Sequence, residues 1–241
     1  MKKQGFVIPH EHGGWAMVSV PFVIGMMAGR PQWMHLPLFL AWLFLYLSSY
    51  PFLQSVKRKK ERRRLIIWGL IYGAIALVCL IPVLISFPEL FYFGPILLVL
   101  LMVNLWHVKQ KSERAVLNDL CAVLIFSIGG AAAYWLGGGG WDRSMLLVVV
   151  FNVLFFMGSV FFVKSVFRER TNGRLIACAK VYHVILLIIS WLFGLPWLMI
   201  AYLFPLIRTF VFAGKTLRPM KVGIIEIIGS VQFLLLAIVV L

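Results

Sequence analysis

The chain has few acidic residues, few cysteines and no polar stretch long enough to form a soluble domain. Only 8 of its 241 residues are Asp or Glu, against 23 Lys and Arg, so its formal net charge is +15. Its three cysteines, Cys79, Cys121 and Cys178, lie in or beside apolar segments without CxxC spacing, which favours buried thiols over a disulfide framework. The motifs CxxCH and HExxH are absent, so the usual signatures of covalent haem and of zinc proteases are missing.

Apolar residues dominate the composition. They make up 62% of the chain, and the mean hydropathy is +0.98, whereas soluble domains are about 45–50% apolar. A membrane-spanning helix needs about 20 mostly apolar residues. We therefore predict an all-α fold: a polytopic membrane helix bundle of about nine transmembrane helices, forming a single integral membrane domain over residues 1–241. The expected spans are residues 15–29, 36–53, 65–87, 91–108, 116–136, 145–163, 175–193, 197–212 and 222–241.

The positive charges are distributed unevenly between the connections. If the segments cross a bilayer, 21 of the 23 Lys and Arg residues lie on one side, and only Arg30 and Arg143 on the other. Short loops rich in Lys and Arg stay in the cytoplasm, so the pattern predicts a multi-pass protein with a cytoplasmic N-terminus and an external C-terminus. This topology depends on the short turn at 194–196, which separates the seventh span from the eighth.

The basic loops also indicate the class of partner. They are too short to fold into a nucleic-acid-binding domain, so we expect membrane lipids or an anionic ligand as partners and no nucleic acid. The oligomeric state is left open by the sequence.

A polar stretch opens the first span. His10, Glu11 and His12 are close enough in sequence to supply metal ligands, with help from elsewhere in the chain. The alternative is that these residues cap the first helix at the membrane interface. A divalent metal is thus one candidate cofactor, and the sequence specifies no other.

Two polar pairs lie where the fourth span ends and the fifth begins. Asn104 and His107 stand three residues apart and share a helical face. Asn118 and Asp119 open the fifth span, where they could cap the helix. Alternatively, Asp119 pairs with a loop Arg or binds a cation. Asn104, His107 and Asn118 are candidate ligand-binding residues, and Asp119 is a candidate catalytic base or charge partner.

Two further candidate residues, one carboxylate and one histidine, lie within the spans. Such residues are costly in a membrane and often functional, so Glu226 and His183 are candidate catalytic residues. For Glu226 the plainer expectation is a salt bridge to Lys215 or Lys221, with Arg208 counted among the loop cations. For His183 it is a histidine satisfied within the core.

The sequence VKSVFRERTNGR follows directly on the sixth span and contains Lys164, Arg168 and Arg170. Lys164 and Arg168 are four apart and would share a helical face. Arginine donates in a planar fork and lysine acts as a point charge, which suits a phosphate or diphosphate. The alternative is an ordinary positive-inside loop, which is how we mainly interpret the denser run at 57–64.

The opening PHEHGGWAMVSVPFVIG, the basic run after the second span and the VKSVFRER loop resemble the YwiC-like family over most of the chain. This resemblance implies a bacterial inner-membrane protein and implies no particular reaction.

A more distant similarity is to the UbiA superfamily of membrane prenyltransferases, which have nine helices and a cytoplasmic N-terminus. Their active site uses the second-to-third and sixth-to-seventh loops, where this chain has its densest basic loops. The similarity implies a UbiA-like architecture with a cytoplasm-facing cavity. The superfamily holds a magnesium–diphosphate with Asp-rich motifs, whereas this chain carries Lys164 and Arg168 where acids are expected. No catalytic Asp is therefore carried over.

Three functions remain open from the sequence, and catalysis is left open with them. The first is that the bundle binds or modifies an isoprenoid or another anionic amphiphile. The second is a transporter or permease of a small solute. The third is a non-catalytic membrane factor for assembly of a respiratory complex, in which the histidines would hold haem or a metal.

Overall fold

The computed structural model describes residues 5–9 and 12–240. The only regular secondary structure in this part of the chain is helical: it has nine α-helices, two short 3-10 helices and no strand. The α-helices are α1 (His12–Ala28), α2 (His35–Lys57), α3 (Arg62–Ser86), α4 (Phe93–Lys109), α5 (Val116–Leu136), α6 (Arg143–Val166), α7 (Gly173–Leu192), α8 (Leu198–Phe212) and α9 (Pro219–Val240). The 3-10 helices are η1 (Lys59–Glu61) and η2 (Pro88–Tyr92).

The predicted helix bundle is confirmed. Seven of the described helical segments are long and apolar enough to cross a membrane, while α1 and α8 are shorter apolar helices of 17 and 15 residues. The short turn between α7 and α8 is also confirmed. It contains Gly194 with φ +75°, a left-handed conformation that glycine adopts without steric cost.

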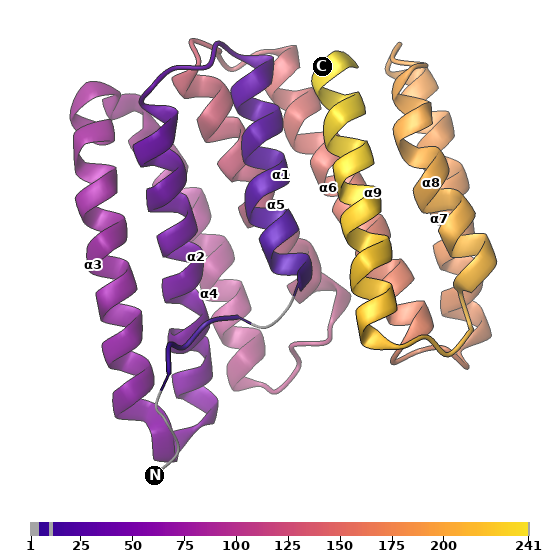
Figure 1. The fold of residues 1–241 in the computed structure, drawn as a ribbon, viewed down its shortest axis with the longest axis horizontal. Helices are drawn as coiled ribbons and strands as arrows, with labels where there is room; N and C mark the ends of the chain where they lie inside the picture. The colour runs from indigo at the N-terminus through magenta and orange to yellow at the C-terminus, as the bar shows by residue number, and fades with distance from the viewer. Residues whose placement is uncertain (1–4, 10–11, 241) are drawn as a thin grey trace.

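The helices stand side by side and alternate in direction (Figure 1). In Figure 1, α3 and α2 lie at one side of the bundle, α8 and α7 at the other, and α1 and α9 next to each other in between. The connections α2–α3, α4–α5, α6–α7 and α8–α9 share one end, which we call the basic end. The described N-terminal segment starts at this end and α9 finishes at the opposite one, as nine spans require. Which end faces the cytoplasm is a prediction from the charges.

Helix α1 joins two hydrophobic clusters. Its Phe22 belongs to a buried cluster with residues of α2, α3, α4 and α5, whereas its Ile24 belongs to a second cluster with α5, α6, α7, α8 and α9. In the second cluster Phe155 of α6 stacks on Phe233 of α9 with ring centroids 4.1 Å apart. Helix α1 therefore connects the two halves of the bundle together with α5 and α6, which also contribute residues to both clusters.

Helices α1 and α5 meet at what we call the glycine interface. A Cβ atom added to Gly25 would lie 1.9 Å from the carbonyl oxygen of Gly130, and one added to Gly130 would lie 2.5 Å from that of Pro21. Backbone therefore lies directly against backbone here. Small residues allow membrane helices to approach this closely.

The outer faces of the bundle are apolar. Val78 and Ile85 of α3 are 71% and 77% exposed, and α4, α7 and α9 also present large exposed hydrophobic side chains. Such a continuous apolar surface suits contact with lipid chains.

Candidate functional site

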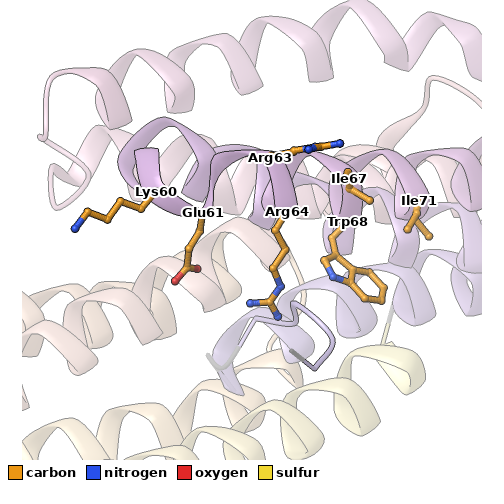
Figure 2. A pocket seen from close by; sticks show the side chains of 7 residues that line it. All are labelled: Lys60, Glu61, Arg63, Arg64, Ile67, Trp68 and Ile71. Atoms are coloured by element: carbon orange, nitrogen blue, oxygen red, sulfur yellow. The ribbon is translucent and has the colours of Figure 1, made fainter. Parts of the chain in front are cut away.

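A shallow hollow lies on α3 next to the basic end (Figure 2). We call it the α3 hollow; its volume is about 530 Å³, and its lining residues are Lys60, Glu61, Arg63, Arg64, Ile67, Trp68 and Ile71. Six of these residues form two rows with a spacing of four, 60/64/68 and 63/67/71. Lys60 belongs to η1, and the other five lie on α3, where rows of this kind are neighbours. A second hollow continues around the same turn and shares Lys60, Arg63 and Ile67.

The α3 hollow is cationic at one end and apolar at the other. Lys60, Arg63 and Arg64 lie at the basic end, while Ile67 and Ile71, 47% and 43% exposed, lie further along α3. Glu61 also lines the hollow, with its carboxylate 3.9 Å from Arg58. The hollow therefore keeps a net positive charge beside an apolar surface.

Residues 5–9, which we call the strap, reach this part of α3. Nη2 of Arg64 donates a hydrogen bond to the carbonyl oxygen of Gly5 at 2.5 Å. The ring of Phe6 meets the ring of Trp68 edge-on, with centroids 5.2 Å apart. Figure 2 shows Arg64 and Trp68 projecting to the same side of α3. The strap thus contacts one row of the hollow.

The three cations proposed for anion binding after α6 have separate surroundings. Lys164 pairs with Asp119 of α5 at 2.5 Å and also donates to the carbonyl oxygen of Arg114. Arg170 donates to the hydroxyl of Thr216. Arg168 is exposed. Two predicted site residues, Lys164 and Asp119, are therefore brought together, but as partners of each other, and anion binding at this loop stays a prediction.

Two of the polar candidate residues at the α4–α5 connection are buried. Asn104 and His107 are 9% and 4% exposed, and Nδ1 of His107 lies 2.8 Å from the hydroxyl of Ser112. The side-chain amide of Asn118 donates back to the carbonyl oxygen of Glu113. Within the described part of the chain, Oδ1 of Asn104 and Nε2 of His107 have no hydrogen-bond partner. Their role as ligand-binding residues stays a prediction.

Glu226 makes an ion pair inside the bundle, with a partner other than those expected. Its Oε1 lies 2.5 Å from Nη1 of Arg208, whose side chain is 1% exposed, so the expectation of Lys215 or Lys221 was wrong. Nη2 of Arg208 donates to the hydroxyl of Ser159, so α6, α8 and α9 meet at this guanidinium. We call this contact the ion-pair interface. The sequence signal for Arg208 was its place within an apolar helix, which counting it as a loop cation ignored.

His183 lies fully buried between α6, α7 and α8. Its Nδ1 donates to the carbonyl oxygen of Ala179 at 2.7 Å, and its Nε2 lies 3.4 Å from the hydroxyl of Thr209. A Cβ atom at Gly158 would lie 3.0 Å from Nε2. These contacts describe a histidine packed in the core, and they leave its predicted catalytic role untested.

The predicted metal site falls mostly outside the described residues. His10 and Glu11 lie in the gap, and His12 is the first residue of α1. Among the residues that the structure describes, no group of three His, Cys, Asp or Glu side chains is placed to hold a metal ion. The metal site at His10, Glu11 and His12 stays a prediction.

Comparison with known proteins finds one matching family model and two relatives that are similar along nearly the whole chain. A family model described as "YwiC-like protein" matches residues 8–134. The chain is 39% identical over 228 residues to "Uncharacterized protein YwiC" of Bacillus subtilis (strain 168), covering 95% of each chain. It is 35% identical over 234 residues to "Uncharacterized protein" of Haemophilus influenzae (strain ATCC 51907 / DSM 11121 / KW20 / Rd), covering 97% of this chain and 98% of that one. No solved structure matches significantly.

Proposed function

We propose that this chain, which belongs to the YwiC-like family, binds an anionic amphiphile at the basic end of α3. The α3 hollow carries this proposal. Its cations Lys60, Arg63 and Arg64 would receive the anionic head, and Ile67 and Ile71 would contact the chain. The site thus differs from the sequence-based candidate after α6, where Lys164 already has an acidic partner.

The chemistry of the hollow suits a phosphate head. Arginine binds phosphate oxygens through parallel N–H donors, and lysine adds a mobile point charge. Each such cation near an anionic membrane surface contributes about 1 kcal/mol. The apolar half of the hollow is open to the side, because Ile67 and Ile71 are exposed, so a chain could enter from the lipid.

Phospholipids and isoprenoid diphosphates share this chemistry. The UbiA-like architecture and its isoprenoid ligand belong to the proposal only as one source of the amphiphile. Mg²⁺ held by carboxylates would be needed to neutralise a leaving diphosphate in that superfamily's way, and the cations of the hollow would repel Mg²⁺. We therefore propose binding, and we leave catalysis out of the proposal.

Native mass spectrometry of the purified protein tests the site. The double variant Arg63→Gln/Arg64→Gln should weaken binding of phosphatidylglycerol by on the order of tenfold. The matched control, Arg168→Gln/Arg170→Gln, removes the same charge from the same end of the bundle and should leave binding nearly unchanged. Phosphatidylcholine and geranylgeranyl diphosphate, tested in parallel, distinguish a phospholipid from an isoprenoid source.

The outcomes separate the two candidate sites. Selective loss in the control pair would move the site to the loop after α6. Equal loss in both pairs would reduce the proposal to general attraction between the basic end and anionic lipid.

We also propose that the basic end faces the cytoplasm of a bacterial cell. Four connections at this end are rich in Lys and Arg, whereas the opposite connections carry Arg30 and Arg143. A C-terminal alkaline phosphatase fusion should be active and a C-terminal green fluorescent protein fusion should be dark. The reverse pattern would invert the topology.

The ion pair between Arg208 and Glu226 favours a second candidate, movement of a small solute. Ionisable residues within membrane segments often mark ion or substrate pathways. Uptake of candidate solutes into proteoliposomes, compared between the natural protein and Glu226→Gln, tests this function. Assembly of a respiratory complex, the third hypothesis, gains no specific support from the described contacts.

A further inference from the structure

We infer that the strap is an intramolecular competitor for the amphiphile at the α3 hollow. The anionic head would replace the carbonyl oxygen of Gly5 on Arg64, and the chain would replace the ring of Phe6 on Trp68. This inference rests on the proposed function, because it concerns how the same site is occupied.

The polar half of the competition involves one guanidinium. Arg64 donates through Nη2 to the Gly5 carbonyl oxygen and also lines the hollow. A phosphate oxygen carries a full negative charge and accepts a stronger, charge-assisted bond than a neutral carbonyl does. A phosphate head entering the hollow therefore displaces Gly5 from Arg64.

The apolar half involves one ring contact. Phe6 meets Trp68 edge-on, yet Phe6 is still 74% exposed. An edge-to-face pair of this kind adds a modest attraction to the area that it buries. An alkyl chain lying along Trp68 can replace that attraction, because the chain also reaches Ile67 and Ile71 in the neighbouring row.

The strap is anchored on the α1 side of these contacts. Residues 5–8 have no regular secondary structure, whereas Pro9 is buried and leads towards α1. Displacement of Gly5 and Phe6 therefore leaves the strap tethered beside the hollow at a high effective concentration. The strap can rebind as soon as the ligand leaves. A ligand therefore occupies the hollow only if its binding free energy exceeds that of the strap contacts.

The two rows of the hollow differ in what covers them. The row 63/67/71 has no described contact with the strap, while Arg64 and Trp68 in the other row do. A ligand with one weakly charged head can use the free row alone. A ligand with a phosphate and a long chain gains from both rows, so the strap selects for phosphorylated amphiphiles.

Two strap variants should shift affinity in opposite directions. Phe6→Ala removes the ring contact, so the affinity for phosphatidylglycerol in native mass spectrometry should rise by about two- to tenfold. Gly5→Glu places a carboxylate beside Arg64, so the affinity should fall. Ile8→Ala is the matched control, since it shortens an exposed strap residue and leaves both contacts in place, and it should have no effect.

Fluorine nuclear magnetic resonance of para-fluorophenylalanine at position 6 gives a direct measure of the ring contact with Trp68. Addition of phosphatidylglycerol should shift this resonance towards that of a ring without an aromatic neighbour, and addition of phosphatidylcholine should not. An unchanged resonance on binding, or a lower affinity in Phe6→Ala, would overturn the competition.

These results are distinguishable from failure of the proposed function. If Arg63→Gln/Arg64→Gln weakens binding while Phe6→Ala and Gly5→Glu leave it unchanged, the site stands and the competing strap is rejected. If Arg63→Gln/Arg64→Gln has no effect, the site itself is wrong, and the strap has nothing to compete for.

Discussion

The glycine interface and the ion-pair interface hold neighbouring helices together by opposite means. Between α1 and α5, Gly25 and Gly130 have no side chain to separate the two backbones. Among α6, α8 and α9, the side chains of Arg208, Glu226 and Ser159 meet across the space between the helices. The glycine interface depends on the absence of side chains, whereas the ion-pair interface depends on charged and polar side chains.

Each solution answers the same physical problem. Lipid chains are as apolar as the helix surfaces, so there is little hydrophobic gain from bringing two membrane helices together. Close backbone packing or interhelical polar contacts have to supply the attraction instead. The two interfaces should consequently fail in different ways: the glycine interface when atoms are added, and the ion-pair interface when one partner is removed.

The largest effect is expected from removing one member of the ion pair. Glu226→Leu leaves the charge of Arg208 buried without its partner, which typically costs about 3–5 kcal/mol. The double variant Arg208→Met/Glu226→Leu has no stranded charge and should recover most of the loss. Unfolding by sodium dodecyl sulfate in mixed micelles measures both. Equal loss in the single and double variants would show that the charge is not what destabilises.

Added atoms should break the glycine interface with a somewhat smaller effect. In Gly25→Ala the new methyl group would lie 1.9 Å from the Gly130 carbonyl oxygen, so α1 and α5 must move apart. Overpacking of this kind costs about 1–3 kcal/mol. Gly94→Ala on α4 is the control, because nothing lies within 4 Å of the added atom. The same denaturant titration should show loss for Gly25→Ala alone.

The ion pair between Lys164 and Asp119 offers an intermediate case. Its side chains are 11% and 24% exposed, against 1% and 13% for Arg208 and Glu226. Its coupling energy should therefore fall between that of a surface pair, about 0–1 kcal/mol, and the penalty for breaking a buried one. A double-mutant cycle with Asp119→Asn and Lys164→Met measures it. If the coupling energy of Lys164 and Asp119 exceeds that of Arg208 and Glu226, the strength of these ion pairs does not follow the burial of their side chains.

The smallest effect concerns pH at the opposite end of the bundle. Asp142 caps α6 by accepting a hydrogen bond from the Met145 amide at 2.9 Å, and this bond holds the pKa of the carboxyl below its usual 3.8. A lowered pKa in the folded state contributes stability above the unfolded pKa, and that contribution is lost as pH falls through the folded pKa. Melting temperature should therefore drop at acid pH less steeply in Asp142→Asn than in the natural protein. If melting temperature falls with pH equally steeply in both proteins, the carboxylate cap at Asp142 does not contribute to the pH dependence of stability.

The general fold was predictable because its signals are local. Runs of apolar residues predict spans, and alternating loop charge predicts their direction, so both the helix count and the turn at Gly194 follow from neighbouring residues. The glycine interface was not predicted. Gly25 and Gly130 are over a hundred positions apart, and no periodicity indicates which helices become neighbours.

The candidate sites show the same limit. The four-residue spacing of Arg64 and Trp68 is visible in the sequence, but the dense basic run was interpreted mainly as a topology signal, and the contact with Gly5 is not local. The partner of Glu226 was missed because Lys215 and Lys221 are closer along the chain than Arg208. The distribution of charges along the sequence predicts on which side of the membrane a cation lies, but it does not predict which carboxylate the cation pairs with.

The shortness of α8 has a consequence for the surrounding membrane. Its 15 residues rise only about 22 Å, whereas the hydrocarbon core of a bilayer is about 30 Å thick. A short apolar segment is accommodated by local thinning of the bilayer or by polar residues reaching towards the surface. Lipids beside α8 would then be compressed relative to those beside the 25-residue α3. The bilayer around the protein would thus be thinner beside α8 than beside α3. Because of this mismatch, membrane thickness would influence how the protein is distributed among lipid phases.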